Sequence, residues 1–195
     1  MRASLKKKGS LSLSINAIVV LIMAITMLGL GLAFMRNTFK SAASSMEGAT
    51  AEIEKQTIDS LKSSGKKVGV SQASLELGPK EKKGVIVAVT NTLDSNSPYY
   101  VEYKILGCSG AYETSCTAGS DLSSLSTSLT TLKFTLVENM GTILEDDAKT
   151  VTLGVETTSG VAAGTITMEL LVYQGSDNTG PLHGAETVTI TTVTK

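Results

Sequence analysis

The sequence has little of what most active sites and metal centres are built from. Its 195 residues include no tryptophan, one histidine, two cysteines and three phenylalanines. Serine is plentiful, but no serine stands in the G-x-S-x-G pattern of a hydrolase nucleophile elbow. A metal site needs histidine and cysteine ligands, or carboxylates at a defined spacing. We therefore expect no enzyme activity, no metal site and no cofactor.

Charge is absent from one long stretch near the start of the chain. No charged residue lies between Lys8 and Arg36. At ~1.5 Å of rise per helical residue this gap measures roughly 40 Å, whereas the hydrocarbon core of a bilayer is ~30 Å thick. Four basic residues, the first of them Arg2, precede the stretch. The positive-inside bias therefore predicts that residues 1–9 lie in the cytoplasm and the rest of the chain outside.

The uncharged stretch is too long for an ordinary secretory signal. Such signals have an apolar region of ~7–15 residues, followed by a cleavage site of small residues. An A-x-A-like site exists at residues 41–43, but Arg36 and Lys40 separate it from the apolar run. This arrangement disfavours ordinary signal cleavage, so we expect the apolar helix to remain on the chain.

A leader-like motif directly precedes the apolar run and consists of Lys7, Lys8, Gly9 and Ser10. Together with the long apolar helix it resembles the class III signal peptide of archaeal type IV pilin-like proteins, a group that includes the archaellins. The resemblance covers about residues 6–35. In that family a prepilin-type leader peptidase cuts after the glycine, and the apolar helix stays on the mature subunit.

The resemblance implies a structural role. The helix would anchor the precursor in the cytoplasmic membrane and then form the core of an extracellular homopolymeric filament. Its partners would be other copies of the chain, the membrane, the leader peptidase and the assembly machinery. Many pilins carry glutamate at the fifth mature position, which here is Ser14. The glutamate-to-amine contact of such pilins is therefore not carried over to this chain.

Loss of residues 1–9 would make the chain acidic. It would remove four of the 17 basic residues and no acid, which leaves 13 basic against 18 acidic residues. An acidic exterior repels the phosphate backbone, so we expect no nucleic acid partner.

Apolar periodicity continues beyond the uncharged stretch and predicts a helix from about residue 14 to residue 62. This helix would be one rod roughly 70 Å long. A loose membrane-proximal stalk is the alternative for residues 37–63. Glycine, serine and lysine then replace the periodicity. We expect a leader at residues 1–9, a transmembrane or filament-core helix at 10–63, a linker at 64–69 and a head domain at 70–195.

The head domain changes to a period of two, which is typical of strands with one buried face. About seven strands are expected, at residues 73–77, 84–90, 101–105, 132–137, 151–155, 166–172 and 188–190. The run at 84–90 is apolar throughout, which predicts a strand covered on both faces. Abundant threonine and valine favour an Ig-like β-sandwich, so the fold class is α+β: a long N-terminal apolar helix and an all-β head.

One predicted connection, residues 107–131, is longer than compact domains usually contain. Asp121 could cap a short helix there, with Leu122, Leu125 and Leu129 on one face. A surface strand is the competing interpretation.

Three groups in the head domain could carry chemistry. Cys108 and Cys116 are expected to form a disulfide in an oxidising exterior; a redox or metal-binding pair is the alternative. His183 stands near Gly180 and Pro181, which predicts a solvated turn residue. The acidic run at 145–147 lacks the D-x-D-x-D-G spacing of a calcium loop, so an acidic turn is favoured over a calcium site.

Small residues recur every seven positions along the apolar helix. They are Ser10, Ala17, Ala24, Gly31, Thr38 and Ser45. A strict heptad repeat keeps one narrow line on the inner side of supercoiled helices. Apolar helices in lipid gain contact mainly by close approach over small residues. This line, called the seam here, is therefore a candidate packing surface between copies; the alternative is chance, because small residues are frequent in membrane helices.

The sequence thus predicts a structural subunit of an extracellular pilus-like or archaellum-like filament, used in adhesion or motility. The first alternative is an uncleaved single-pass protein that presents the sandwich as an adhesin or receptor. The second is a secreted hydrolase, which the missing catalytic residues disfavour. A mature chain that starts at Ser10 supports the filament, one that starts at Met1 the anchored module, and one that starts at Ser44 ordinary secretion.

Overall fold

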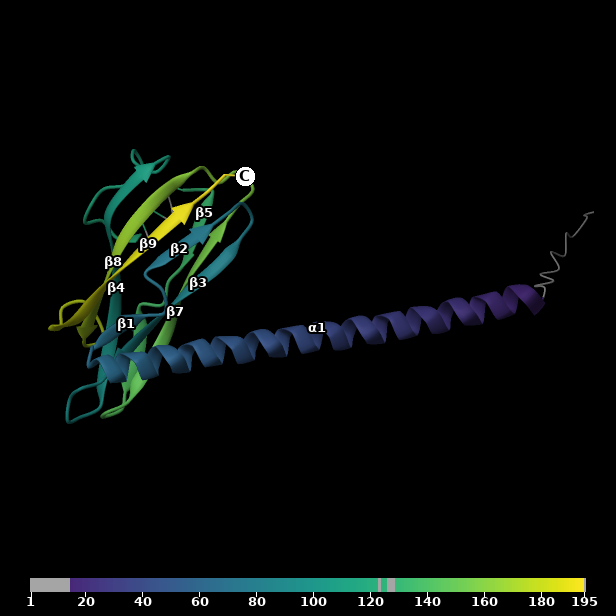
Figure 1. Ribbon diagram of the computed structural model, residues 1–195, viewed down its shortest axis with the longest axis horizontal. Coiled ribbons are helices and arrows are strands. Elements are labelled where there is room, and N and C mark those ends of the chain that lie inside the picture. Colours follow the sequence, from purple (N-terminus) through teal and green to yellow (C-terminus); the bar gives the residue numbers. More distant parts are fainter. Residues whose placement is uncertain (1–14, 123, 126–128, 195) are drawn as a thin grey trace, which may run out of the picture. The chain divides into compact units, whose positions relative to one another are not determined.

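The computed structural model describes residues 15–122, 124–125 and 129–194, except the side chains of residues 43, 44, 46 and 47. The chain divides into two compact units, Met1–Ala49 and Thr50–Lys195. We call them the helix unit and the head unit. Helix α1 (Ile15–Ser64) supplies the described part of the helix unit and also the first residues of the head unit (Figure 1). Residues 10–14 of the predicted helix lie outside the described residues.

Helix α1 ends within two residues of the predicted position, at a glycine. Gly65 has a φ of 67°, which is the left-handed conformation that most often terminates helices. Its amide donates a hydrogen bond to the carbonyl of Lys62. The continuous helix is confirmed, and the alternative of a loose stalk at residues 37–63 is not what the structure contains.

The head unit contains two packed sheets, as the sequence predicts. The four-stranded sheet has the order β1 (Val68–Val70), β3 (Lys82–Thr90), β7 (Ala148–Thr157), β5 (Leu132–Thr135). The five-stranded sheet has the order β2 (Ser74–Leu77), β9 (Leu182–Thr192), β8 (Gly164–Gln174), β4 (Ser97–Gly110), β6 (Asn139–Ile143). All neighbouring strands are antiparallel except β2 and β9, which are parallel.

The core lies between the two sheets and follows the alternation in the sequence. On β8 the side chains of Ile166, Met168, Leu170 and Val172 are fully buried, while their neighbours are partly exposed. Strand β3 differs, because every residue from Val85 to Thr90 is buried. Its continuous apolar run is therefore covered on both faces, which confirms the prediction.

The described residues form nine strands, not about seven, and both additional strands contain glycine. Strand β1 begins inside the expected linker of residues 64–69 and ends one residue beyond it. The segment around Gly69 has the composition of a loop, but Val68 is only 3 % exposed. Strand β6 contains Gly141 with a φ of 71°. Glycine in a strand weakens the sequence signal and often marks a close backbone approach or a bulge.

The last turns of α1 belong to the head unit. Leu61 and Thr57 are buried, and a Cβ atom at Gly69 would lie 2.9 Å from Cδ1 of Leu61. A side chain at position 69 would therefore require Leu61 to shift where β1 passes the helix. The boundary expected at residue 63 marks the end of the helix. The boundary between the two compact units lies earlier, between Ala49 and Thr50.

The long connection is shorter than predicted and takes part in the core. Strand β4 continues to Gly110, beyond the expected end at Ile105. Residues 122, 124 and 125 are helical, and Leu122 and Leu125 are buried among core residues. The short helix is therefore favoured over the surface strand, and its leucines anchor the connection.

One buried asparagine joins the loop from β3 to β4 with the loop from β6 to β7, at one end of the sandwich. Asn91 is 1 % exposed, and its Nδ2 donates hydrogen bonds to the carbonyls of Ser95, Ile143 and Leu144. Its Oδ1 accepts hydrogen bonds from the Leu93 amide and, at 2.8 Å, from the Tyr99 hydroxyl. Every polar atom of this side chain is thus used.

We expect Asn91→Ala to destabilise the head unit strongly. The substitution leaves buried carbonyls and the Tyr99 hydroxyl without a partner, at a cost of about 3 kcal/mol. For a unit of this size that corresponds to a melting temperature lower by roughly 10 °C. Thermal unfolding followed by circular dichroism measures the change. Asn96→Ala is the control, because this exposed side chain accepts one hydrogen bond, from the Glu145 amide; equal shifts for both variants would contradict the account.

Candidate functional site: an uncovered apolar helix

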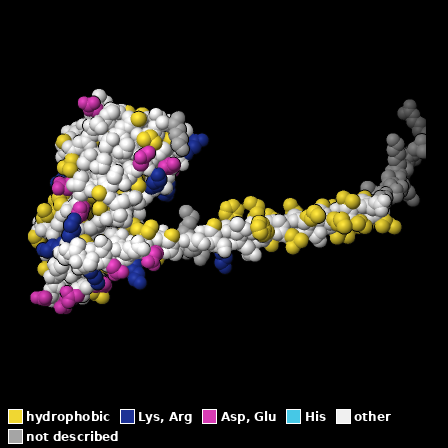
Figure 2. All heavy atoms as spheres, viewed as in Figure 1, with side chains coloured by type: hydrophobic (Ala, Val, Ile, Leu, Met, Phe, Trp, Pro, Cys, Tyr) yellow, Lys and Arg dark blue, Asp and Glu magenta, His cyan; other side chains and the backbone are white. Residues whose placement is uncertain are grey.

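The largest apolar surface belongs to helix α1. The segment Ile15–Ala42 is 28 residues long with a mean hydropathy of 2.7, and none of it is buried within the chain. At ~1.5 Å per residue it measures roughly 42 Å, more than a bilayer core requires. By length and composition it is a candidate signal anchor or membrane span. Hydrophobic side chains gather along this part of the helix (Figure 2).

The exposed apolar side chains of α1 need to be covered by lipid or by another molecule. Ile15 is 80 % exposed, and Leu30 and Phe34 are each 72 % exposed. Burial of such side chains is favourable by about 1.5–3 kcal/mol each, so an uncovered row of them in water is strongly unfavourable. The helix unit offers no surface of its own that covers them among the described residues.

The seam lies on the exposed helix. Ala17, Ala24, Gly31 and Thr38 are all in α1, and a straight helix drifts by ~20° per heptad, or about 60° across these four positions. A Cβ atom at Gly31 would meet nothing within 4 Å, so packing inside the chain does not require this glycine. Thr38 directs its hydroxyl to the carbonyl of Phe34, 2.9 Å away. The leader residues Lys7, Lys8, Gly9 and Ser10 lie outside the described residues.

Cys108 and Cys116 form a disulfide, with 6.1 Å between their Cα atoms. Both pack partly buried against the core cluster. The bond ties the end of β4 to the connection that follows it. Structural disulfides persist mainly in oxidising compartments, so this one is typical of an extracytoplasmic domain.

Replacing both cysteines by alanine should lower the free energy of unfolding of the head unit by about 2–3 kcal/mol, the value of a short closed loop. Denaturant unfolding of the variant and of the unmodified protein measures this difference. Mass spectrometry of unreduced, alkylated protein provides an independent check. Two alkylated thiols in protein taken from its native exterior would refute the disulfide.

His183 is not the solvated turn residue that its sequence neighbours predict. It lies on β9, half-buried, with Nε2 2.8 Å from the carbonyl oxygen of Thr90. Its ring packs edge-to-face on Tyr99, with 4.8 Å between ring centroids. Burial lowers the pKa of His183 in spite of the hydrogen bond with Thr90. Its role is structural: it fixes the start of β9 against the end of β3.

A polar cluster lies on the outer face of β4 and β8. Burial acts to raise the pKa of Glu102, but hydrogen bonds from Asn178, Lys104 and Tyr173 outweigh it and lower this pKa. Burial and the hydrogen bond to Glu138 raise the pKa of Tyr100 to about 12. The cavity beside them is only about 60 Å³. Among the described residues, no group of three or more histidine, cysteine, aspartate or glutamate side chains is arranged to hold a metal ion.

An open groove of about 570 Å³ runs between the last turns of α1 and the segment that links β1 to β2. Ile53, Leu61 and Val70 supply apolar surface, and the Lys66–Glu186 ion pair, with 2.8 Å between Nζ and Oε1, lies at its side. Its remaining lining consists largely of serine, threonine and glutamine. Among the described residues that line it, none is a histidine or a cysteine.

Comparisons with known proteins assign no family to this chain. No protein-family model matches the chain, and no curated protein matches it. Solved structures that match include the PapD-like domain 7 of human CEP192 at 8 % identity and a TM-score of 0.39, covering 66 % of this chain and 85 % of that one.

Two further matches are parts of larger proteins. A family 123 glycoside hydrolase from Clostridium perfringens matches at 8 % identity and a TM-score of 0.39, covering 63 % of this chain and 23 % of that one. The E. coli alpha-2-macroglobulin matches at 9 % identity and a TM-score of 0.39, covering 66 % of this chain and 7 % of that one. The chain thus spans a small part of either protein.

Proposed function

We propose that the chain is the structural subunit of an extracellular type IV pilus-like or archaellum-like filament, used in adhesion or motility. The observation that carries the proposal is the uncovered 28-residue apolar segment of α1, which continues without a break into a helix end that packs on a folded sandwich. The leader-like motif at residues 7–10 and the disulfide in the head unit support the same interpretation.

The helix serves two environments in this proposal. In the precursor its apolar side chains lie in lipid, with residues 1–9 in the cytoplasm. After cleavage at Gly9 by the leader peptidase, the same side chains are buried against neighbouring copies, which keeps apolar surface away from water. The seam residues allow the helices to approach closely, because lipid tails are as apolar as leucine and contact is gained mainly by packing. The subunit needs no cofactor and performs no catalysis.

A single-pass anchored adhesin or receptor is the second candidate. The groove beside α1 favours it, because a groove of about 570 Å³ is large enough to hold part of a partner. In that case α1 stays in the membrane and no subunit contacts form along the seam.

Mechanical shearing of intact source cells separates the two candidates. The filament proposal expects the chain as the main component of sheared fibres that sediment and are visible by electron microscopy. Recovery of the chain only from the membrane fraction, with none in sheared material, would contradict the filament and support the anchored module.

A further inference from the structure

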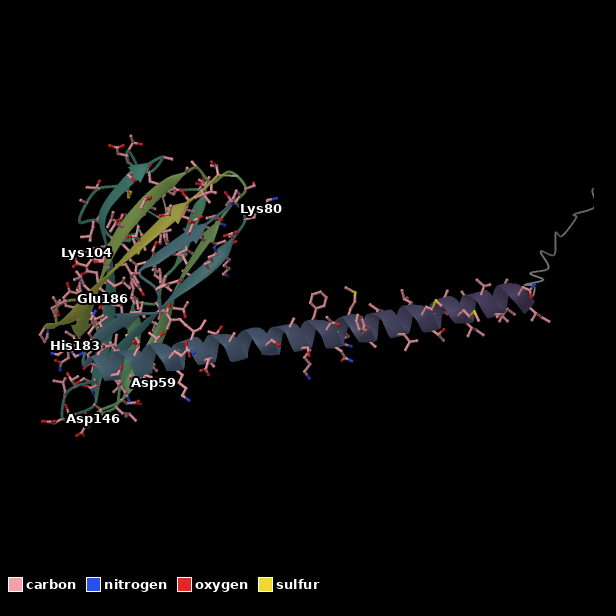
Figure 3. All side chains as sticks on the ribbon, viewed as in Figure 1. Asp59, Lys80, Lys104, Asp146, His183 and Glu186 are labelled. Carbon is pink, nitrogen blue, oxygen red and sulfur yellow. A yellow bond between two sulfur atoms is a disulfide. The ribbon has the colours of Figure 1, made fainter. Side chains whose placement is uncertain are left out.

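An open strand edge borders the groove beside α1. The groove lies wholly within the head unit, because all of its lining residues fall between Ile53 and Glu186. Strand β2 covers the edge of β9 only from Thr189 onward. The first half of β9, which carries Glu186, therefore has β8 on one side and no paired strand among the described residues on the other (Figure 3).

Main-chain groups in the first half of β9 point toward this open side. The Thr189 amide donates a hydrogen bond to the Ala73 carbonyl, at 2.8 Å, so Thr189 directs its amide and carbonyl toward the side that β2 occupies. The direction alternates along a strand, and the pairing of β9 with β8 is regular beyond Gly184. The amides and carbonyls of Ala185 and Thr187 therefore point to the same side as those of Thr189, but upstream of β2.

The edge is open because the chain crosses between the two sheets just before β2 begins. The Ser71 amide donates to the Ile86 carbonyl of β3, and the Ile86 amide donates to the Ser71 hydroxyl. Residue 71 therefore still belongs to the four-stranded sheet, whereas the Ala73 carbonyl already bonds to β9. Gln72 and Ala73, which make the crossing, line the groove.

Strand β1 presents a second open edge to the same groove. Lys67 and Ser71 both direct main-chain groups to β3, since the Lys67 carbonyl accepts a hydrogen bond from the Thr90 amide. By the same alternation Val70 directs its amide and carbonyl away from β3, and Val70 lines the groove. Strand edges from both sheets thus border one cavity of about 570 Å³.

The rest of the lining decides which kind of partner fits. Helix α1 contributes Ile53, which is 45 % exposed, and several uncharged polar side chains. The two charged residues of the described lining, Lys66 and Glu186, neutralise each other. This lining therefore has no surplus positive charge for phosphates, and none of its residues is an aromatic on which a nucleobase could stack. The groove offers unpaired main chain beside a neutral, partly apolar wall.

We propose that the groove binds an extended, uncharged peptide segment of another protein, which adds to the sheet at the open edge of β9. Strand addition takes its affinity from main-chain hydrogen bonds and its specificity from the side chains that alternate along the added strand. An unpaired edge is a template for such pairing. The site goes beyond the proposed filament, because it lies in the head unit and does not use the seam.

Hydrogen exchange of the chain without a partner tests the open edge itself. The amides of Ala185 and Thr187 should exchange at least tenfold faster than those of Glu186 and Val188, which the alternation directs to β8. Equal protection of all four amides would mean that the edge is already covered, and would overturn the proposal.

Random heptapeptides displayed on phage are the probe for binding. Selection against the full chain in detergent micelles should enrich peptides that bind the unmodified chain. Ser60 is exposed and lines the groove, so Ser60→Trp should fill it and weaken binding of the enriched peptides at least tenfold. Ser63→Trp makes the same change at an exposed position of the same helix outside the lining, and binding should stay within twofold. No enrichment, or equal binding to both variants, would overturn the proposal.

Synthetic versions of an enriched peptide test main-chain pairing. In an added strand only alternate amides face the partner, so N-methylation should weaken binding about tenfold at every second position and little between them. Thr187→Pro removes an edge donor without removing a hydrogen bond inside the chain, and should weaken binding about tenfold. Thermal unfolding establishes that the head unit of this variant remains folded. Losses without a period of two would indicate a helical or irregular occupant and would overturn the proposal.

Two further outcomes separate this inference from its rivals. Self-association of the unmodified chain that Ser60→Trp abolishes, measured by analytical ultracentrifugation in detergent, would place a second copy in the groove and overturn the proposal. The filament proposal is tested independently. Normal fibres from Ser60→Trp with loss of peptide binding support both, whereas absence of fibres from the unmodified chain in its source cells removes the filament alone.

Discussion

Gly9→Leu should leave the whole population of the chain as a membrane-bound precursor that is nine residues longer than the mature form. The leader-like motif places Gly9 directly before the apolar run. In the proposed function a leader peptidase cuts after this glycine, and we expect a bulky side chain there to block the cut. Without cleavage the lysines of residues 6–8 stay joined to the helix. Their charges would have to be buried with it in a filament core, which is prohibitively costly.

The measurement combines intact mass with fibre yield at matched expression. Ala3→Leu adds a similar side chain to the leader away from the scissile bond and should be processed and assembled normally. Normal fibres from Gly9→Leu would contradict the class III leader, because the proposal requires residues 1–9 to be removed before assembly.

Ala24→Leu and Gly31→Leu should each reduce fibre yield at least tenfold while leaving membrane insertion intact. Both substitutions keep or increase apolarity, so the helix still partitions into lipid. Both add volume on the seam, where the proposed function requires close approach between helices. A Cβ at Gly31 meets nothing within 4 Å, so it creates no clash inside one subunit.

Ala33→Leu is the matched control, because it makes the same change on the same helix but off the seam. Its fibre yield at equal precursor level should stay within about twofold of the unmodified chain. Equal losses from seam and off-seam variants would remove the seam, although the filament proposal would remain.

The long elements of the fold could be predicted because their patterns are repeated many times. The apolar run and its continuation specify α1 through many turns, and strands such as β8 alternate over a full 11 residues. The continuous run of β3 also indicates its burial on both faces, which follows from hydrophobicity alone. These repeated hydrophobic patterns lie within single elements, so they can be recognised without knowing which segments pack together.

The missed features depend on tertiary contacts between distant segments. Strands β1 and β6 are three and five residues long and contain glycine, so too few alternating positions exist to reveal them. The sequence neighbours of Asn91 give no signal, and those of His183 indicate a turn. The burial of both side chains follows from loops and strands that only the fold brings together.

The candidate packing seam and the disulfide both depend on residues that are close in the sequence. The seam is inferred from spacing along a single helix, whose geometry is local, and its described members lie on α1. Its role in packing between copies stays a prediction. The disulfide also follows from two cysteines close in sequence. The groove beside α1 could not be anticipated, because it forms between the helix end and a strand that the sequence does not reveal.

The start of the mature chain tests the central claim most directly. N-terminal sequencing, with the intact mass, of protein taken from the surface of its source cells determines it. The filament account predicts a chain that begins at Ser10 and retains the whole apolar helix. A chain that begins at Met1, or one that begins at Ser44 and has lost the helix, would contradict it.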